Sequence, residues 1–417
     1  MRVLGATSCG RKVRGMAEIE AVSDTELITR ARDMVPKLRE RAAEVERESR
    51  LSDETMAELR AADLFRVLQP RAFGGLERNF GTMVEIAFEL GRGCASTAWV
   101  YQNLTMHQLL IGFFPRKAQE DFWGQDPTRL ISTAWAAKHS TARPVDGGYL
   151  VTGHWEFASG ILNNEGVSVM APVEGREIAP GIAERRFFLL EEDRKDYEIE
   201  RVWDVIGLRG TGSEDVFCKD VFVPEHRSLS TVKSNMHGDK VVLQGEAVHD
   251  STFYRVPLWS WFPMTIPPAL VGAAQGGLEH MIALLEGRTD LFGHQLAERE
   301  GVKKRLAEAS AKIDAARLLL RRDLQEMADL ADRWEVPSVE RRGVWRRDAS
   351  YSAILAFEAV GTLFYRGGAH GIGVDDALAR AYRDIGAGAT HVSADFDVAG
   401  EIYGEAVQGQ PVRNPNF

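Results

Sequence analysis

The chain has 417 residues, a formal net charge of −10 and 44% hydrophobic residues. A chain of this length is too long for one hydrophobic core, so two or three domains are expected. The acidic balance argues against nucleic acid or an anionic membrane as a partner, because both require a basic face. No apolar run reaches the length that spans a membrane.

The three cysteines, Cys9, Cys94 and Cys218, form no C-x-x-C pair. Neither a disulfide framework nor a zinc knuckle is predicted, and a reducing cytoplasm is the expected location. None of the ten histidines has metal-ligand spacing, so no metal is expected. The first residues are basic, but no apolar segment typical of a signal peptide follows them. We expect residues 1–20 to form a flexible tail.

Helical periodicity in residues 21–128 predicts an N-terminal α-helical domain. It opens with a capping box at residues 23–26. The period changes to two in residues 129–230, which predicts a central β domain. Strand-like runs occur there at residues 149–152, 167–171, 186–190 and 216–223.

Residues 231–265 have no clear period and are dense in aromatic residues between Phe253 and Phe262. Such a segment is either a substrate loop or a packed linker between domains, and the sequence favours neither. Residues 266–417 return to helical spacing and predict a C-terminal four-helix bundle, with helices at 272–285, 303–330, 351–364 and 376–394. The expected fold class is α+β.

One stretch has the character of a ligand site, Gly153-His154-Trp155-Glu156-Phe157-Ala158-Ser159-Gly160. It follows a Gly-Gly turn and an alternating strand, so the Ser159 hydroxyl is expected at a strand end, where it can bond to a buried heteroatom. A second glycine-rich stretch, residues 207–213, lacks G-x-G-x-x-G spacing and precedes a strand, so a tight turn is favoured over a dinucleotide fingerprint. His391, on a predicted helix of small apolar residues, and His107 are by default core histidines.

Five segments in order resemble the acyl-CoA dehydrogenase superfamily. They are LF (64–65), PRAFGG (70–75), GGYLVTGHWEFASG (147–160), IGLRGTGSEDVFCKDVFVP (206–224) and RAYRD (380–384). The resemblance covers about residues 25–400. It implies an N-terminal helical domain, a central β-barrel-like domain and a C-terminal four-helix bundle that together hold a flavin.

Two departures separate the chain from typical dehydrogenases of this superfamily. Their W-I-T-N segment corresponds here to Phe157 at the Trp position and Ser159 at the Thr position. Their catalytic Glu corresponds to Val392, next to His391. Abstraction of an α-proton requires a carboxylate base within reach, and nothing in the sequence points to Glu401 or another residue as a substitute. Dehydrogenation is therefore disfavoured.

F-A-S-G together with R-D-x6-H resembles the two-component flavin-dependent monooxygenase branch, which includes the oxygenase components of p-hydroxyphenylacetate hydroxylase and of a steroid-ring phenol hydroxylase. The resemblance implies that a separate NAD(P)H:flavin reductase supplies reduced flavin, FMNH2 or FADH2. With O2 as cosubstrate, a C4a-hydroperoxyflavin would then hydroxylate an aromatic substrate. Among aromatic substrates, a phenol is the first expectation. A homotetramer formed through the helical bundle is also implied.

The resemblance assigns three catalytic residues. Ser159 corresponds to the serine that bonds flavin N5, His391 to the histidine beside the hydroperoxide, and His107 to a histidine that contacts substrate. A hydroxyl on N5 in a dry pocket slows loss of peroxide. An imidazole of ordinary pKa, about 6.5, can hold or deliver a proton. A second imidazole can take a phenolic proton.

Further residues are assigned to the cofactor and the substrate. Phe157, Thr133 and Ala134 are expected at the flavin. Arg288, with Phe292, resembles the superfamily's R-x-x-F-G with one extra residue and is expected at a flavin phosphate. In the aromatic segment, Arg255 is expected to pair with an anionic group of the substrate, and Trp259 or Phe262 to stack on its ring.

Other functions stay open on the sequence alone. An enzyme of the same branch that oxygenates nitrogen or sulfur would share the flavin site. An acyl-CoA dehydrogenase and a non-catalytic helical scaffold are the remaining alternatives. The sequence does not name the substrate or decide between FMN and FAD.

Overall fold

The computed structural model describes residues 22–190, 195–231, 249, 251–290, 292–365, 369–414 and 417. The expected flexible tail, residues 1–20, lies outside the described residues. So do residues 232–248 and 250 of the aromatic segment 231–265.

The N-terminal part of the described chain is helical, as its periodicity predicted. Its helices are α2 (Asp24–Asp33), α3 (Val35–Glu48), α4 (Asp53–Ala61), α5 (Phe80–Gly93), α6 (Ala95–Gly112) and α7 (Arg116–Trp123), with short 3-10 turns η1 (Leu64–Arg66) and η2 (Arg71–Phe73). The Ser23 hydroxyl accepts a hydrogen bond from the Glu26 N–H at 3.1 Å, so the predicted capping residue begins α2. Nearly every residue of α6 is buried. A helix that is buried on all sides can present side chains to several neighbours at once.

The centre of the chain forms a mixed sheet. Its strands are β1 (Ile131–Ala134), β2 (Ala136–Val145), β3 (Gly148–Ala158), β4 (Gly166–Ala179), β5 (Ile182–Leu189), β6 (Glu198–Glu200), β7 (Glu214–Pro224) and β8 (Ser228–Ser230). They pair in the order β6-β7-β3-β2-β4-β5-β8, and β1 pairs in parallel with β4. The antiparallel register places Ala158 of β3 opposite Glu214 of β7. The residues beside that pair, Ser159 and Ser213, are therefore neighbours.

The C-terminal part is again helical. Its helices are α8 (Leu258–Trp261), α9 (Pro267–Leu285), α10 (Glu300–Asp332), α11 (Val339–Phe364), α12 (Ala377–Ala389) and α13 (Phe396–Val407). The single helix predicted for residues 376–394 is wrong in its extent: α12 ends at Ala389, and α13 begins at Phe396. The Asp395 carboxylate accepts hydrogen bonds from the N–H groups of Asp397 and Val398, which is a helix N-cap that the periodicity did not reveal.

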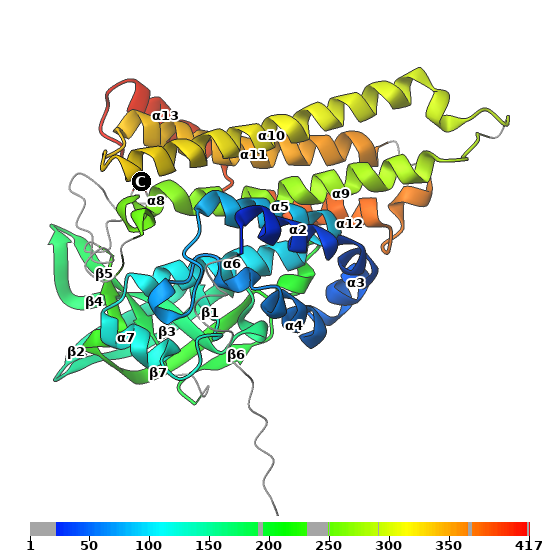
Figure 1. Ribbon diagram of the computed structural model, residues 1–417. Helices are drawn as coiled ribbons and strands as arrows, with labels where there is room; N and C mark the ends of the chain where they lie inside the picture. Colours follow the sequence, from blue (N-terminus) through cyan, green and yellow to red (C-terminus); the bar gives the residue numbers. More distant parts are fainter. Residues whose placement is uncertain are drawn as a thin grey trace, which may run out of the picture.

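Figure 1 shows three layers. The long helices α9, α10 and α11 lie on one side, most of the N-terminal helices lie in the middle, and the strands lie on the other side together with α7. Helix α6 lies in the middle layer, between the strands and the C-terminal helices. No described helix is both long enough and apolar enough to span a membrane.

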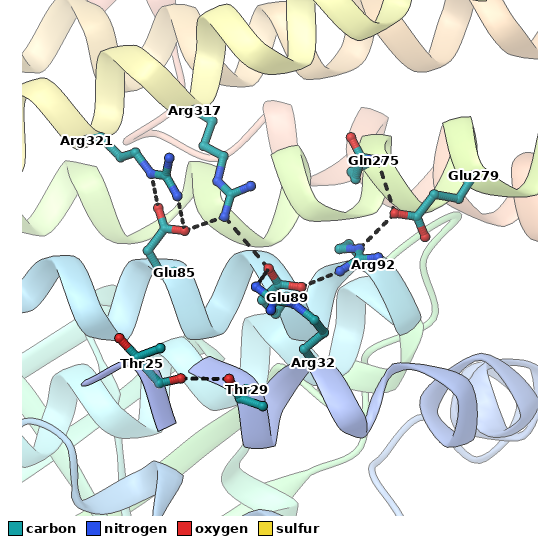
Figure 2. Close-up of polar contacts among 10 residues, drawn as sticks. All are labelled: Thr25, Thr29, Arg32, Glu85, Glu89, Arg92, Gln275, Glu279, Arg317 and Arg321. Carbon is teal, nitrogen blue, oxygen red and sulfur yellow. Dashed lines mark hydrogen bonds and ion pairs between the residues drawn. The ribbon is translucent and has the colours of Figure 1, made fainter. Parts of the chain in front are cut away.

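A network of ion pairs joins the middle layer to the long helices (Figure 2). It consists of Glu85, Glu89 and Arg92 on α5, Arg32 on α2, Glu279 on α9, and Arg317 and Arg321 on α10. Glu89 is only 2% exposed. Carboxylates buried this deeply are stabilised by charged hydrogen bonds, so the network holds α5 against both α9 and α10.

Candidate active site

Ser159 follows directly after β3, as the sequence predicted. The strand ends in an irregular register near Phe157, whose φ of 63° lies in the left-handed region. This conformation is uncommon for a bulky side chain and occurs mostly at turns and functional sites. It leaves the Phe157 ring 55% exposed, edge-to-face with Trp203 at 6.1 Å between centroids. An exposed aromatic face beside a strand-end hydroxyl suits a planar ligand.

The Ser159 hydroxyl has two side-chain partners. The Trp99 indole Nε1–H of α6 donates to Ser159 Oγ at 3.2 Å. Ser213 Oγ lies 2.8 Å away on the other side, and Thr211 Oγ1 lies 2.7 Å from Ser213 Oγ. The turn at residues 207–213 is compact, with the 3-10 helix η4 (Arg209–Thr211) and Leu208 at a φ of 54°. It is a tight turn, as predicted, and it contributes two hydroxyls to the site.

His391 approaches the same indole from the C-terminal helices. Its ring meets that of Trp99 edge-to-face, with centroids 5.7 Å apart. The predicted position of His391 on a helix is wrong, because α12 ends at Ala389 and His391 lies in the turn before α13. The Ser393 N–H donates to His391 Nδ1 at 3.0 Å. In the neutral ring the proton is therefore on Nε2.

The charge state of His391 differs from the sequence-based expectation. Removal of the ring from water and, as a smaller cause, the nearby Arg346 guanidinium together lower the pKa of His391 to about 4. Arg346 is itself buried, and it donates to the carbonyl of Val392 at 2.8 Å and to that of Ser393. The turn that carries His391 is thus held by a cation, and the imidazole is neutral at pH 7.

His107 lies two helical turns beyond Trp99 on α6. The side chain is 2% exposed and faces the backbone of Ile131 in β1, but neither ring nitrogen makes a hydrogen bond of good geometry with a described residue. Burial lowers the pKa of His107 to about 3, so this ring is also neutral. Two further buried hydroxyls lack partners among the described residues, Thr133 on β1 and Ser168 opposite it on β4. Buried polar atoms without partners are rare in native proteins and commonly mark a ligand or water site.

Aromatic side chains gather at the end of β1. Trp135 contacts Phe262 at 4.7 Å and Trp259 at 5.6 Å between ring centroids. The Trp259 indole nitrogen is buried without a partner in the described part of the chain. Trp135 directly follows β1 and lies two residues after Thr133. Trp259 and Phe262 of the aromatic segment therefore pack against the residue that directly follows β1, the strand that carries Thr133.

Other predicted site residues have different surroundings. Arg255 stacks on Trp334 at 3.2 Å and donates to the Ala331 carbonyl at 3.1 Å, so its guanidinium is engaged at the end of α10. The expected pairing of Arg255 with a substrate anion does not match this placement. Arg288 lies in the turn after α9, and its phosphate contact stays a prediction. The Ala134 side chain belongs to the core of the β domain, so only its backbone is available to a cofactor.

No carboxylate occupies the position of the dehydrogenases' base. Val392 is there, with its side chain 60% exposed. Glu401 is exposed on α13 and pairs with Arg413 at 3.1 Å. Among the described residues, no hydrogen bond or ion pair links a carboxylate to Ser159, Trp99 or His391. The site is therefore built from neutral donors and acceptors.

Sequence reasoning missed several residues at this site. They are Trp99, Trp135, Ser168, Thr211 and Ser213. Trp99 lies eight residues before His107 on one helix, and this spacing puts both side chains on a similar face. Ser213 directly precedes a predicted strand, and pairing of that strand with the one ending at Ser159 would have brought the two serines together. The helical spacing was the signal that could have revealed Trp99, and the strand pairing was the signal that could have revealed Ser213.

One group among the described residues could hold a metal, namely His154 on β3, Glu200 on β6 and Asp215 on β7. The Lys138 ammonium already lies 2.9 Å from Asp215, and His154 Nε2 lies 2.7 Å from the same carboxylate oxygen. A bound cation would have to displace this ammonium. We therefore interpret the group as a network of ion pairs that joins β2, β3, β6 and β7.

Comparison with known proteins first defines the class. Residues 23–124 match the family described as acyl-CoA dehydrogenase, N-terminal domain, and residues 264–396 match acyl-CoA dehydrogenase, C-terminal domain. These matches flank the β domain and agree with the order of helices, strands and helices along the chain.

Individual relatives narrow the class. The chain is 35% identical to the flavin-dependent monooxygenase oxygenase subunit HsaA of Mycobacterium tuberculosis, over 91% of this chain and 94% of that protein. The crystal structure of HsaA superposes with a TM-score of 0.87 over 95% of this chain and 100% of HsaA. The chain is also 32% identical to the oxygenase component of the FADH(2)-dependent resorcinol hydroxylase of Rhizobium sp., over 92% of this chain and 94% of that one.

A third relative was solved with its cofactor. The structure of XiaF from Streptomyces sp. in complex with FADH2 and glycerol is 26% identical, with a TM-score of 0.82 over 96% of this chain and 98% of XiaF. The chain belongs to the family of oxygenase components of flavin-dependent monooxygenases, which has the acyl-CoA dehydrogenase fold.

Proposed function

We propose that this protein is the oxygenase component of a two-component monooxygenase that uses reduced flavin and O2 to hydroxylate a small aromatic substrate with a phenolic hydroxyl. The observations that carry the substrate class are the buried polar atoms of His107, Thr133, Ser168 and Trp259, which have no hydrogen-bond partner in the described part of the chain, and the aromatic side chains that gather at the end of β1. Rings stack on aromatic walls, and a phenolic hydroxyl can satisfy buried donors and acceptors.

Reduced FAD is the cofactor that we favour, since FADH2 is named for both the resorcinol hydroxylase and XiaF. When bound, the reduced flavin would supply two electrons to O2, so that one oxygen atom of O2 is transferred to the substrate and the other leaves as water. The exposed ring of Phe157 and the Ser159 hydroxyl fit a flavin whose N5 faces Ser159. Val202 and Ile206, which are close to Trp203 in the sequence, also have exposed apolar side chains.

The two histidines would act as neutral groups. His391 presents its Nε2–H as a donor, because Nδ1 is occupied by the Ser393 N–H. Its ring packs against the Trp99 indole, and the same indole donates a hydrogen bond to Ser159. His107 has a lowered pKa, so it is suited to accept a hydrogen bond from a substrate hydroxyl rather than to remove its proton outright.

Partners follow from the family. An oxygenase component receives its reduced flavin from a separate flavin reductase. The turn at residues 207–213 is packed as a tight turn and does not have the form of a dinucleotide loop.

We also propose a homotetramer formed through the C-terminal helices, supported by the exposed apolar side chains of Ile282, Leu318 and Tyr351. Light scattering on the purified protein tests the assembly.

The function is tested by mixing the protein with photoreduced FAD and oxygenated buffer in a stopped-flow instrument. Oxidised-flavin absorbance should return more slowly than for free flavin, and a monohydric phenol should yield a catechol by chromatography. Glu401→Gln, on an exposed face of α13, is a matched control that should behave as the parent. Reoxidation as fast as that of free flavin, without any hydroxylated product from phenols, would contradict the proposal.

A further inference from the structure

Five polar groups, joined by four hydrogen bonds, form a continuous chain that runs through Ser159. Trp99 Nε1 lies 3.2 Å from Ser159 Oγ, and Ser159 Oγ lies 2.8 Å from Ser213 Oγ. Ser213 Oγ lies 2.7 Å from Thr211 Oγ1, which in turn lies 2.9 Å from the Leu208 carbonyl oxygen. Ser213 and Thr211 are almost fully buried, so water does not compete for these hydroxyls.

The direction of the chain follows from counting protons. A carbonyl oxygen only accepts, so the Thr211 hydroxyl donates its one proton to Leu208. Thr211 Oγ1 must then accept from Ser213, and Ser213 Oγ must accept from Ser159. At the other end the Trp99 indole only donates, and it donates to Ser159. Every bond therefore runs in one direction, from Trp99 to Leu208.

The opposite direction is disfavoured. It would leave Thr211 Oγ1 and the Leu208 carbonyl oxygen 2.9 Å apart with no proton between them. The Leu208 end of this hydrogen-bonded chain is also fixed in place, because the Leu208 N–H donates to the buried carboxyl of Asp384 on α12 at 2.6 Å. The Thr211 carbonyl accepts from the Gly160 N–H at 2.9 Å, which ties the turn to the residue after Ser159.

The direction decides what Ser159 can offer a ligand. A hydroxyl has one proton and two lone pairs. The proton of Ser159 is committed to Ser213, and one lone pair is taken by Trp99. One lone pair remains, so toward a ligand Ser159 is an acceptor.

The redox state of a flavin decides whether N5 donates or accepts a hydrogen bond. Reduced flavin carries a proton on N5 and donates there, whereas oxidised flavin has only a lone pair on N5. We propose that Thr211 and Ser213 are positioning residues that hold Ser159 as a hydrogen-bond acceptor, and that the site thereby selects reduced over oxidised flavin. This inference rests on the proposed function, in which Ser159 faces N5.

The test compares the binding of the two redox forms rather than turnover. Dissociation constants of oxidised and photoreduced FAD are measured under anaerobic conditions by titration, and their ratio is taken for each variant. The parent should bind the reduced form more tightly. Ser213→Ala releases the Ser159 proton toward N5, so the preference should fall by about tenfold, the value of one hydrogen bond. Thr211→Val should have the same effect, because Ser213 can then turn its proton to Ser159.

Two control variants test whether the change in the ratio comes from the hydrogen-bonded chain or from packing. Thr211→Ser keeps the hydroxyl and should keep the parent's ratio. Ser132→Ala removes another buried hydroxyl, one that donates to the Ser159 carbonyl at 2.8 Å, and should also leave the ratio unchanged. The thermal midpoint of each variant establishes that it is folded.

The outcomes are distinguishable. If the parent binds both forms but Ser213→Ala and Thr211→Val keep its ratio, the inference is overturned while the proposed function stands. A loss of preference in Thr211→Ser as large as that in Thr211→Val would also overturn it. If the parent binds neither form of FAD or FMN, the proposed function fails, and the inference fails with it.

Discussion

Trp99 lies on helix α6 and His391 in the turn between α12 and α13, far apart in the sequence, and their rings meet edge-to-face at 5.7 Å between centroids. The same indole donates its N–H to Ser159. One side chain of the N-terminal helices thus links the strand-end hydroxyl of the β domain to the histidine of the C-terminal helices. Changes at this junction should affect the coupling of flavin oxidation to hydroxylation more than they affect folding.

Trp99→Phe tests that link. The phenyl ring can still pack against His391, but the N–H donor to Ser159 is lost. We expect release of hydrogen peroxide to rise by about five- to tenfold relative to product, the value of about 1 kcal/mol for one hydrogen bond. Peroxide and product are measured in the same reaction. Unchanged coupling would show that Ser159 does not depend on Trp99.

Ser159→Ala removes the predicted contact to N5 itself. Peroxide release should be faster than in Trp99→Phe, because the acceptor is absent rather than weakened. Ser132→Ala serves as the control for the loss of a buried hydroxyl beside Ser159. Equal coupling of oxygen use to product in Ser159→Ala and the parent would show that the site has been assigned to the wrong residue.

His391→Ala should lower the rate of hydroxylation by about 100-fold, within the range of a lost proton-transfer group. Binding of reduced flavin should change little, since the ring contacts Trp99 and the turn rather than the strand end. Single-turnover product yield and the dissociation constant for reduced FAD are the two measurements. A variant that hydroxylates as well as the parent would remove His391 from the mechanism.

The lowered pKa of His391 also predicts a dependence of stability on pH. In the folded protein the pKa is about 4, whereas an unfolded histidine has a pKa of about 6.5. Between these values the unfolded chain binds more protons, so the free energy of unfolding should fall as the pH drops from about 6.5 to about 4. His391→Gln does not titrate and should lose less stability in this window. Denaturant unfolding of both proteins at several pH values checks the sign, and parallel profiles would contradict it.

The lowered pKa of Glu85 predicts a second dependence of stability on pH, in a more acidic range. Burial alone would raise the pKa of Glu85, but hydrogen bonds from Arg321 and Arg317 outweigh it and lower the pKa. A lowered carboxyl pKa stabilises the fold above the unfolded value, about 4.3, and this contribution is lost as the pH falls through the folded value. Glu85→Gln should therefore destabilise the protein at pH 7 by about 1–3 kcal/mol, because two guanidinium groups lose a charged partner.

The control for this prediction is Glu120→Gln. Glu120 pairs with Arg116 on the surface of α7, where both side chains are half exposed, so its removal should have little effect at any pH. The difference between parent and Glu85→Gln should shrink as the pH falls below about 4. A constant difference would show that packing, rather than charge, explains the loss of stability.

Some of the fold and site could be predicted from local patterns. The change of period from 3.6 to two and back predicted helices, then strands, then helices. Ser23 begins a helix and Ser159 ends a strand because capping and strand termination depend on adjacent residues. The turn before α13 was missed because the N-cap Asp395 follows small residues that continue a helical pattern.

Residues whose partners are distant in the sequence could not be predicted in this way. Arg255 was expected at a substrate anion, but the packing of α10 supplies Trp334 and the Ala331 carbonyl as its partners. Its charge and its aromatic neighbours in the sequence gave no sign of that helix. The lowered pKa values of His391 and His107 likewise depend on burial by elements far along the chain.

The sequence by itself determined the order of helices, strands and helices along the chain, the strand-end position of Ser159 and the family resemblance, because these depend on short-range periodicity and motifs. Only the tertiary structure decided which groups surround Ser159. Trp99 lies 60 residues before it and Ser213 lies 54 residues after it. Strand register and the packing of α6 on the sheet bring these groups within hydrogen-bond distance, and neither is encoded by the spacing of residues along one element.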